Sequence, residues 1–188
     1  MESPTKNRIA AITGHTAGIG KAIAQALSAS GYDIQGFSRS NGYDISNSRD
    51  LVRIVEQSAG ADLFINNAYH DFAQCRLLEL VFGFWKNNPN KTIVNINSRA
   101  KYGVGNAKKY AQTKAELFAK SKKMMFSGKR CRIININPGY VHTQMVEHVH
   151  GKYNMMTTQQ IAEAVLWCVN QPQGIEVGEL SIWTTTLT

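Results

Sequence analysis

Residues 8–31 read RIAAITGHTAGIGKAIAQALSASG. The apolar run at residues 8–13 is typical of a strand buried on both faces of a parallel sheet. Residues 20–31 carry apolar side chains at helical spacing and end at a glycine, which is a common helix stop signal. Between the two segments lies a turn that contains Gly14, Gly18 and Gly20. This order of strand, glycine-rich turn and helix predicts an α/β fold whose first turn can bind a diphosphate.

The three glycines have separate expected roles. Gly14 permits a tight turn, Gly18 lets the backbone approach a ligand, and Gly20 lets the helix pack closely on the strand. The first helical turn then offers unpaired N–H groups and the positive end of the helix dipole to an anion. The alternative is a glycine-rich turn that binds no ligand.

Apolar runs and helical patterns alternate along the rest of the chain. Strands are predicted at residues 32–38, 61–67, 91–98, 130–139 and 179–185. Helices are predicted at residues 50–60, 72–86, 106–125 and 157–171, the last with Thr157 as a cap. We therefore expect one domain, residues 1–188, built as a doubly wound parallel sheet with helices on both faces. In such a sheet, ligands bind beyond the carboxyl ends of the strands.

Composition narrows the classes of protein to consider. With 188 residues, of which 43% are apolar, the chain can bury a core of its own. Cys75, Cys131 and Cys168 are widely spaced and odd in number, so we expect buried thiols in a reducing compartment. The polar start MESPTKNR and the lack of any long apolar run predict a cytoplasmic protein without a secretory segment or membrane span.

The net charge of +8 leaves three kinds of partner open: nucleic acid, an acidic protein and an anionic ligand. The basic residues are scattered, apart from a modest cluster at residues 120–130. No helix-turn-helix, zinc-finger or RNP-like pattern accompanies them, which disfavours nucleic acid.

Further motifs follow the later predicted strands. Asn66-Asn67-Ala68 follows the third strand, and Ser98 ends the fourth. Tyr110-x-x-x-Lys114 lies on the helix after it, and the segment from Pro138-Gly139 to Thr143 follows the fifth strand. With TGHTAGIG, these motifs resemble in order and spacing the signatures of the short-chain dehydrogenase/reductase family over nearly the whole chain. The resemblance implies a Rossmann-like fold and NAD(P)-dependent hydride transfer between the nicotinamide and a carbonyl or alcohol substrate.

The resemblance also implies three catalytic residues. Tyr110 exchanges a proton with the substrate oxygen, and Ser98 holds that oxygen toward it. Lys114, one turn further along the helix, supplies positive charge that lowers the pKa of Tyr110 and binds the nicotinamide ribose. Taken alone, the Tyr–Lys spacing favours a solvent-exposed aromatic beside a surface charge, because it occurs by chance in many chains.

The cofactor-binding residues implied by the resemblance lie at five places along the chain. They are Gly14, Thr16, Gly18, Ile19 and Gly20; Ser38, Arg39, Ser40, Asp44 and Ile45; Asn67 and Ala68; Tyr110 and Lys114; and Pro138, Gly139, Val141 and Thr143. Among them, Asp44 is expected to accept from the adenine amino group.

Arg39 bears on the choice of cofactor. No acidic residue ends the second predicted strand, because Asp33 lies at its beginning. An Arg at this place can accommodate a ribose 2′-phosphate, whereas an acidic residue would bind the 2′-hydroxyl. We expect NADP(H) to be favoured over NAD(H). The alternative is a surface arginine in a turn.

The chain departs from the family pattern in four ways. It is shortened between the second strand and Asp44, and again between Asn67 and Ser98. Tyr69 stands where the family has a glycine, which is expected to place a ring near the cofactor. The helix that carries a proton-relay Asn in many relatives offers no obvious equivalent, because the matching place falls near His70 and Asp71.

The loop at residues 143–157 carries Met145, Val146, Val149, Tyr153, Met155 and Met156, which suit an apolar lid over the substrate. Three histidines, His142, His148 and His150, lie in or beside this loop without the spacing of a zinc site. We expect no metal there.

A homodimer or homotetramer is expected from two apolar segments. Residues 77–85 read LLELVFGFW, and the predicted helix at residues 106–125 also presents Leu117, Phe118, Met124 and Met125. The alternative is that Leu77, Leu78, Val81 and Phe84 all fill the chain's own core.

Two other functions stay open. The chain could be a non-catalytic dinucleotide-binding sensor or scaffold, because its fold is shortened and its relay residue is unassigned. A third, weaker hypothesis uses the positive charge to bind nucleic acid or an acidic carrier protein.

Overall fold

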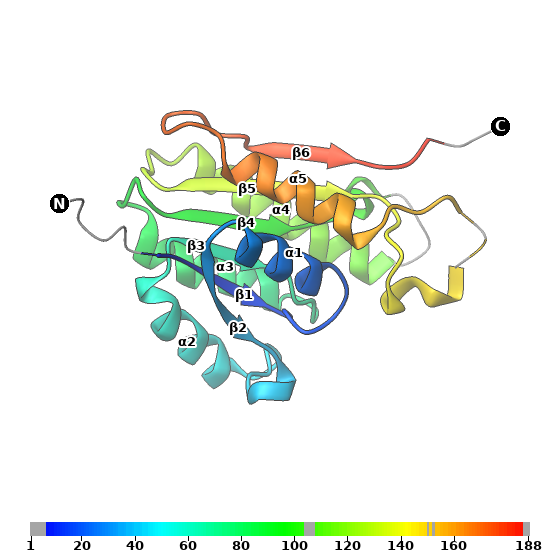
Figure 1. Ribbon diagram of the computed structural model, residues 1–188, viewed down its shortest axis with the longest axis horizontal. Helices are drawn as coiled ribbons and strands as arrows, with labels where there is room; N and C mark the ends of the chain where they lie inside the picture. Colours follow the sequence, from blue (N-terminus) through cyan, green and yellow to red (C-terminus); the bar gives the residue numbers. More distant parts are fainter. Residues whose placement is uncertain (1–6, 104–107, 150, 152, 186–188) are drawn as a thin grey trace.

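The computed structural model describes residues 7–103, 108–149, 151 and 153–185. Its centre is one six-stranded parallel sheet in the order β2-β1-β3-β4-β5-β6 (Figure 1). The strands are β1 Arg8–Thr13, β2 Tyr32–Phe37, β3 Leu63–Asn66, β4 Thr92–Ile96, β5 Arg132–Pro138 and β6 Glu179–Ile182. The strand order reverses between β1 and β3, so both strands end at the place where a ligand is expected.

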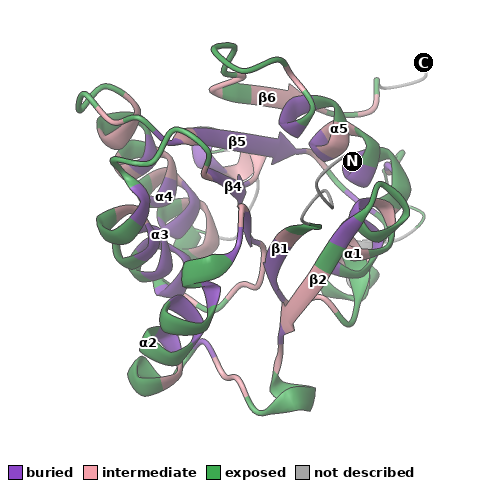
Figure 2. Cartoon of the chain, turned by 60° about the vertical axis from the view of Figure 1, so that its left-hand side comes forward, coloured by how far each residue is buried: buried purple, intermediate pink, exposed green. Residues whose placement is uncertain are grey.

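Five α-helices cover the two faces of this sheet, as Figure 2 shows. Helices α1 (Gly18–Ala29) and α5 (Thr158–Val169) pack on one face. Helices α2 (Ser48–Gln57), α3 (Ala73–Trp85) and α4 (Lys108–Met125) pack on the other. Each face has its own buried apolar cluster, so the predicted doubly wound fold is confirmed.

The shortening predicted after the second strand leaves β2 at the edge of the sheet. Instead of a helix and a further strand, a short 3-10 turn at Arg39–Asn41 leads through residues 42–47 directly into α2. The second contraction is also present, because α3 is the one α-helix between β3 and β4.

Several predicted boundaries differ from the structure for local reasons. The helix predicted at residues 50–60 divides into α2 and a 3-10 turn at Ser58–Gly60. The last strand ends at Ile182 rather than residue 185, and β6 pairs only with β5. The predicted cap of α5 is correct, since Thr157 Oγ1 accepts from the Gln160 N–H, with Gln160 bonding back to Thr157.

A row of buried asparagines crosses the sheet. Asn66, Asn95 and Asn135 are in register on β3, β4 and β5, and each is fully buried. Asn66 Nδ2 donates to Asn95 Oδ1 at 3.0 Å, and Asn135 Nδ2 donates to Ser121 Oγ on α4 at 2.8 Å. Asn66 Nδ2 also donates to the carbonyl oxygen of Gln74 on α3 at 2.9 Å, so these bonds tie both α3 and α4 to the strands.

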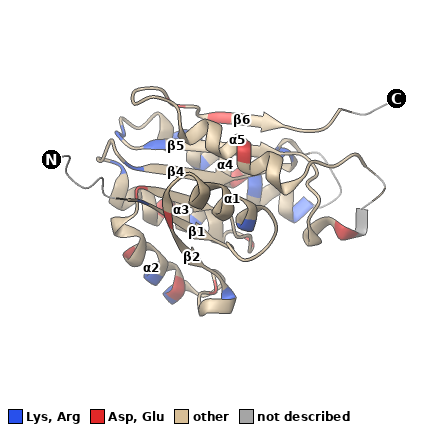
Figure 3. Ribbon diagram, in the orientation of Figure 1, with Lys and Arg blue, Asp and Glu red and all other residues tan. Residues whose placement is uncertain are grey.

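The distribution of charged residues and the burial of the cysteines are typical of a globular protein. Figure 3 shows the basic residues spread over several elements. Within the basic cluster, Lys120 pairs with Glu79, and Lys129 with Glu176 at 2.7 Å, so part of its charge is neutralised. The three cysteines are buried and free. No helix within the described residues is long and apolar enough to cross a membrane.

Candidate functional site

The glycine loop between β1 and α1 has the geometry that the sequence predicted. Gly14 and Gly18 have φ values of 72° and 53°, a region that side chains disfavour. A Cβ added at Gly20 would lie 2.2 Å from the carbonyl oxygen of Gly14. The helix therefore packs against the turn more closely than any other residue would allow. Thr16 is exposed in this loop, and Ile19 packs against the core.

Asn67 has a structural role that the sequence analysis did not assign to it. Its Nδ2 donates to the carbonyl oxygen of Thr13 at 2.9 Å. The hydroxyl of Thr13 in turn accepts from the backbone N–H groups of Asn67 and Ala68. These bonds brace the glycine loop and engage the Nδ2 donor of Asn67, a residue that was expected to bind the cofactor.

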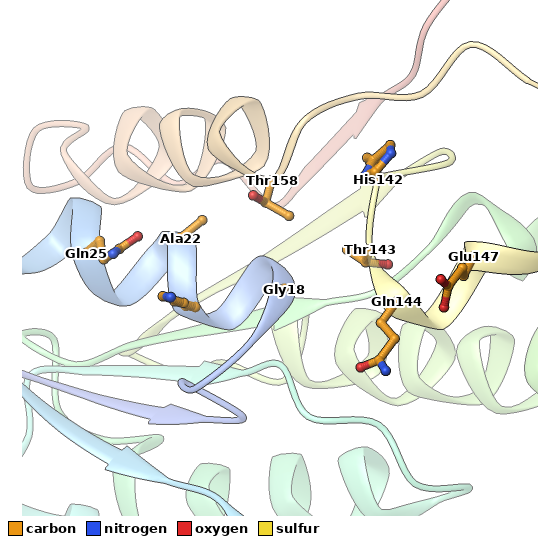
Figure 4. A pocket seen from close by; sticks show the side chains of 9 residues that line it. Gly18, Ala22, Gln25, His142, Thr143, Gln144, Glu147 and Thr158 are labelled. Carbon is orange, nitrogen blue, oxygen red and sulfur yellow. The ribbon is translucent and has the colours of Figure 1, made fainter. Parts of the chain in front are cut away.

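A cavity of about 540 Å³ lies between the start of α1 and the segment after β5. In Figure 4, α1 lies on one side of it, and Thr143, Gln144 and Glu147 lie on the other. A Cβ at Gly18 would lie 3.5 Å from Thr143 Cγ2, so the glycine turn and Thr143 face each other directly. No acidic residue occupies the first turn of α1. The cavity, the glycine turn and the helix N-terminus together fit a diphosphate.

Most other residues of the segment from Pro138 to Thr143 are less accessible to a ligand in this cavity. Pro138 is buried at the end of β5, and Val141 is buried in the core under α5. Gly139 donates its N–H to Ile182 on β6, and a Cβ there would collide with Trp183. In this segment, His142 and Thr143 line the cavity.

At the end of β2, Ser38 begins the 3-10 turn, and its hydroxyl bonds to that of Ser40 at 2.8 Å. Arg39 is exposed, and among the described residues no hydrogen bond or ion pair engages its guanidinium. Asp44 accepts from the Ser46 N–H at 2.9 Å, which lowers the pKa of its carboxyl, and Arg39 adds a smaller effect. Ile45 is buried beneath α2. Arg39 and Asp44 thus lie at the same end of the sheet.

Ser98 and Tyr110 meet beyond the end of β4. Ser98 caps a short 3-10 turn by accepting from the Ala100 N–H at 3.1 Å. The side chain of Ser98 acts on the phenol of Tyr110 and lowers its pKa, and the ring of Tyr110 makes an edge contact with Tyr69 at 4.9 Å between centroids. Tyr69, the residue after Ala68, therefore connects the braced glycine loop to the candidate proton donor.

Lys114 is enclosed behind these two tyrosines. Its Nζ donates to Gln74 Oε1 at 2.6 Å and to the carbonyl oxygen of Ile96 at 2.9 Å. The same nitrogen lies 5.4 Å from the ring centroid of Tyr110 and 5.5 Å from that of Tyr69. Burial lowers the pKa of Lys114 to about 7.

The pKa of Tyr110 differs from the sequence-based expectation. Burial raises this pKa above its ordinary value, and the hydrogen bond with Ser98 offsets only part of the rise. Lys114 was expected to lower it. The physical reason for the difference is that an enclosed amine with a pKa near 7 carries less positive charge at neutral pH than an exposed lysine does.

Gln74 is the site residue that the sequence analysis missed. The place suggested for a relay residue, near His70 and Asp71, instead holds an ion pair between Asp71 and Lys109 at 2.8 Å. The sequence pattern could have identified Gln74, because it is the one strongly polar residue on the buried face of α3, which also carries Leu77, Leu78 and Val81. Such a residue needs a polar partner.

The histidine loop is only partly described. His142 is exposed, whereas the side chain of His148 and all of His150 lie outside the described part of the chain. Met156 is buried, while Met145 and Tyr153 are exposed, and Tyr153 stacks on Tyr140. Across the described side chains, no three His, Cys, Asp or Glu residues are grouped to hold a metal ion.

Comparison with known proteins agrees with this geometry, although no family model matches the chain. The human protein "Dehydrogenase/reductase SDR family member 11" is 26% identical, over 96% of this chain and 95% of that protein. The alignment spans 248 residues against 188 here, as expected if the chain is shortened.

Solved structures show the same fold. An NADH complex of 3-ketoacyl-(acyl-carrier-protein) reductase from Brucella melitensis has a TM-score of 0.78 at 19% identity, covering 94% of this chain and 96% of that one. An alcohol dehydrogenase from Thermococcus sibiricus, complexed with 5-hydroxy-NADP, has a TM-score of 0.78 at 20% identity, covering 93% and 95%.

The packing at Gly20 generates a direct test. Gly20→Ala must push the turn away from α1, so we expect a loss of about 1–3 kcal/mol in the free energy of unfolding, typical of overpacking. We also expect NADPH to bind at least ~10-fold more weakly, the equivalent of about 1.4 kcal/mol. Denaturant unfolding and NADPH fluorescence titration measure the two effects.

Gly83→Ala is the matched control. Gly83 lies in α3 with nothing within 4 Å of an added Cβ, so this change should leave NADPH affinity unaltered and stabilise the helix slightly. Unchanged affinity and stability in Gly20→Ala would contradict the close packing described above.

Proposed function

We propose that this chain, which belongs to the short-chain dehydrogenase/reductase family, is an NADP(H)-dependent oxidoreductase acting on a carbonyl or alcohol. The observation that carries the proposal is the continuous contact from the glycine loop to the candidate catalytic group. Thr13 binds Ala68, the next residue Tyr69 packs on Tyr110, and the amine of Lys114 lies behind both rings.

In the proposed reaction, the bound nicotinamide supplies a hydride to the carbonyl carbon or takes one from the alcohol carbon. Tyr110 gives its phenolic proton to the carbonyl oxygen during reduction and recovers it during oxidation. Ser98, whose side chain acts on the phenol, orients that oxygen. Lys114 stabilises the phenolate that forms, because an ammonium charge close to the ring becomes more favourable as negative charge develops there.

The cofactor assignment rests on the loop, the cavity and the open end of β2. The two αL glycines and the cavity between α1 and Thr143 accommodate a diphosphate. Arg39 is exposed beside Asp44 and has no described partner of its own, which suits a ribose 2′-phosphate. Of the two solved structures compared above, one is described as a complex with NADH and the other as a complex with 5-hydroxy-NADP.

We therefore expect tighter binding of NADPH than of NADH. Arg39→Ala should weaken NADPH binding by at least ~10-fold, since a charge-assisted contact to phosphate contributes roughly 1.5–3 kcal/mol. NADH affinity should change little. Fluorescence titration of both cofactors against wild type and variant makes the measurement, and equal affinities in the wild type would contradict the preference.

The role of Tyr110 is tested by Tyr110→Phe, which removes only the hydroxyl. The ring contact with Tyr69 should survive, so the fold and NADPH affinity should be retained. Turnover should fall by at least ~10²-fold, the usual scale for a positioned acid–base group. The assay is NADPH oxidation against a panel of ketones, aldehydes and acyl thioesters.

Two further variants separate the roles. Lys114→Met should impair both turnover and cofactor binding, whereas Ser98→Ala should mainly reduce turnover. If the wild type binds NADPH but reduces nothing on the panel, the non-catalytic sensor becomes the better assignment. The raised pKa of Tyr110 is the observation that favours that second candidate.

A homo-oligomer is also proposed, on a smaller surface than the sequence suggested. Leu77, Leu78 and Val81 fill the chain's own core, as the alternative held, but Phe84 is 68% exposed and Leu80 37%. These two side chains lie one helical turn apart on α3, so they share one exposed face of that helix. We expect a dimer or tetramer by light scattering at micromolar concentration.

Phe84→Glu should shift the assembly toward monomer, because a buried unpaired carboxylate is costly. Val52→Glu, at an exposed position on α2, is the matched control and should leave the mass unchanged. A monomeric wild type would contradict the proposal.

A further inference from the structure

Gln74 is locked in place by a reciprocal pair of hydrogen bonds with Asn66. Gln74 Nε2 donates to the backbone carbonyl oxygen of Asn66 at 2.8 Å, and Asn66 Nδ2 donates to that of Gln74 at 2.9 Å. Asn66 is itself held by Asn95 within the buried row across the sheet. The first turn of α3 is therefore tied to the end of β3 at this residue.

The same contacts settle which way the amide of Gln74 points. Its Nε2 has two carbonyl acceptors, Asn66 at 2.8 Å and Ile96 at 3.2 Å. The oxygen must then be Oε1, which faces Lys114 Nζ at 2.6 Å. The reversed amide would place an N–H group against an amine that donates, so the network allows one orientation.

Lys114 uses two of its three N–H donors in this arrangement. One bonds to Gln74 and one to the carbonyl oxygen of Ile96. Both acceptors lie on the side of α3 and β4, and the aromatic rings of Tyr69 and Tyr110 lie within 5.5 Å of the nitrogen.

Few titratable groups face this amine. They are the phenols of Tyr69 and Tyr110 and the thiol of Cys75, whose pKa burial raises to about 11. No carboxylate among the described residues bonds to Lys114 Nζ. The side-chain acceptor that stabilises the charged form of Lys114 is therefore the neutral amide of Gln74.

We propose that Gln74 is a positioning residue that holds the amine of Lys114 against Tyr110 and sets the pH at which that amine is protonated. It does so by direct contact, as an acceptor whose orientation is fixed by Asn66 and Ile96. The importance of Gln74 for turnover rests on the function proposed above. Its hydrogen bond to Lys114, in contrast, is present in the protein without any ligand.

The protonation of Lys114 can be followed by NMR on protein labelled with ¹³C and ¹⁵N in lysine, without cofactor or substrate. The Lys114 signal is assigned as the one lost in Lys114→Met. In the wild type we expect a titration midpoint of about 7. Gln74→Glu puts a carboxylate beside the ammonium, so the midpoint should rise by roughly 1–3 units.

Gln74→Met keeps the length of the side chain but removes the acceptor, so the midpoint should fall. This second variant keeps the test decisive if the glutamate variant does not fold. Gln112→Glu, on the exposed part of α4, adds the same charge away from the site and should leave the midpoint unchanged. Circular dichroism confirms that each variant is folded.

A purely structural role for Gln74 would alter stability and leave the midpoint within about 0.3 units in both variants, far below the shift expected of an adjacent charge. That result would overturn the inference. Because the titration needs no ligand, a protein that binds no NADPH would refute the proposed function and leave this test intact. Where turnover is found, the pH–rate profile of Gln74→Glu should shift in the same direction as the NMR midpoint.

Discussion

The amine of Lys114 is fully enclosed, and the site is organised around the hydrogen bonds that make this burial tolerable. Taking an ammonium out of water is expensive unless good acceptors replace the water. Here the acceptors are the side chain of Gln74 on α3 and the carbonyl of Ile96 at the end of β4. They come from two elements, so the helix, the strand and α4 itself must all be correctly placed before Lys114 can lie beside Tyr110.

The polar row across the sheet provides that placement, and it explains how the fold tolerates its deletions. The row joins β3, β4 and β5 to both α3 and α4 through Asn66, Asn95 and Asn135. The lost crossover lies at the other edge, beyond β2, where Arg39–Asn41 leads almost directly toward α2. The glycine loop is braced separately, by Thr13 and Asn67. Shortening the chain there leaves both supports of the site intact.

The sequence predicted the fold and the glycine loop because both depend on local patterns. Apolar runs, helical spacing and the place of Gly20 have direct structural consequences. It did not predict Gln74, the bracing role of Asn67 or the raised pKa of Tyr110, since these depend on which side chains meet across elements and on how far they are buried. Phe84 shows the same limit: spacing on α3 does not separate it from buried Val81, yet it is exposed.

The central claim is that the cavity beside the glycine loop belongs to a site for a nicotinamide cofactor, with the reacting ring next to Tyr110. A crystal structure of the complex with NADPH tests this most directly. The account predicts the diphosphate at the N-terminus of α1, the 2′-phosphate at Arg39, and the nicotinamide ribose hydroxyls within hydrogen-bond distance of Lys114 Nζ. A cofactor bound elsewhere, or a nicotinamide ring turned away from Tyr110, would contradict it.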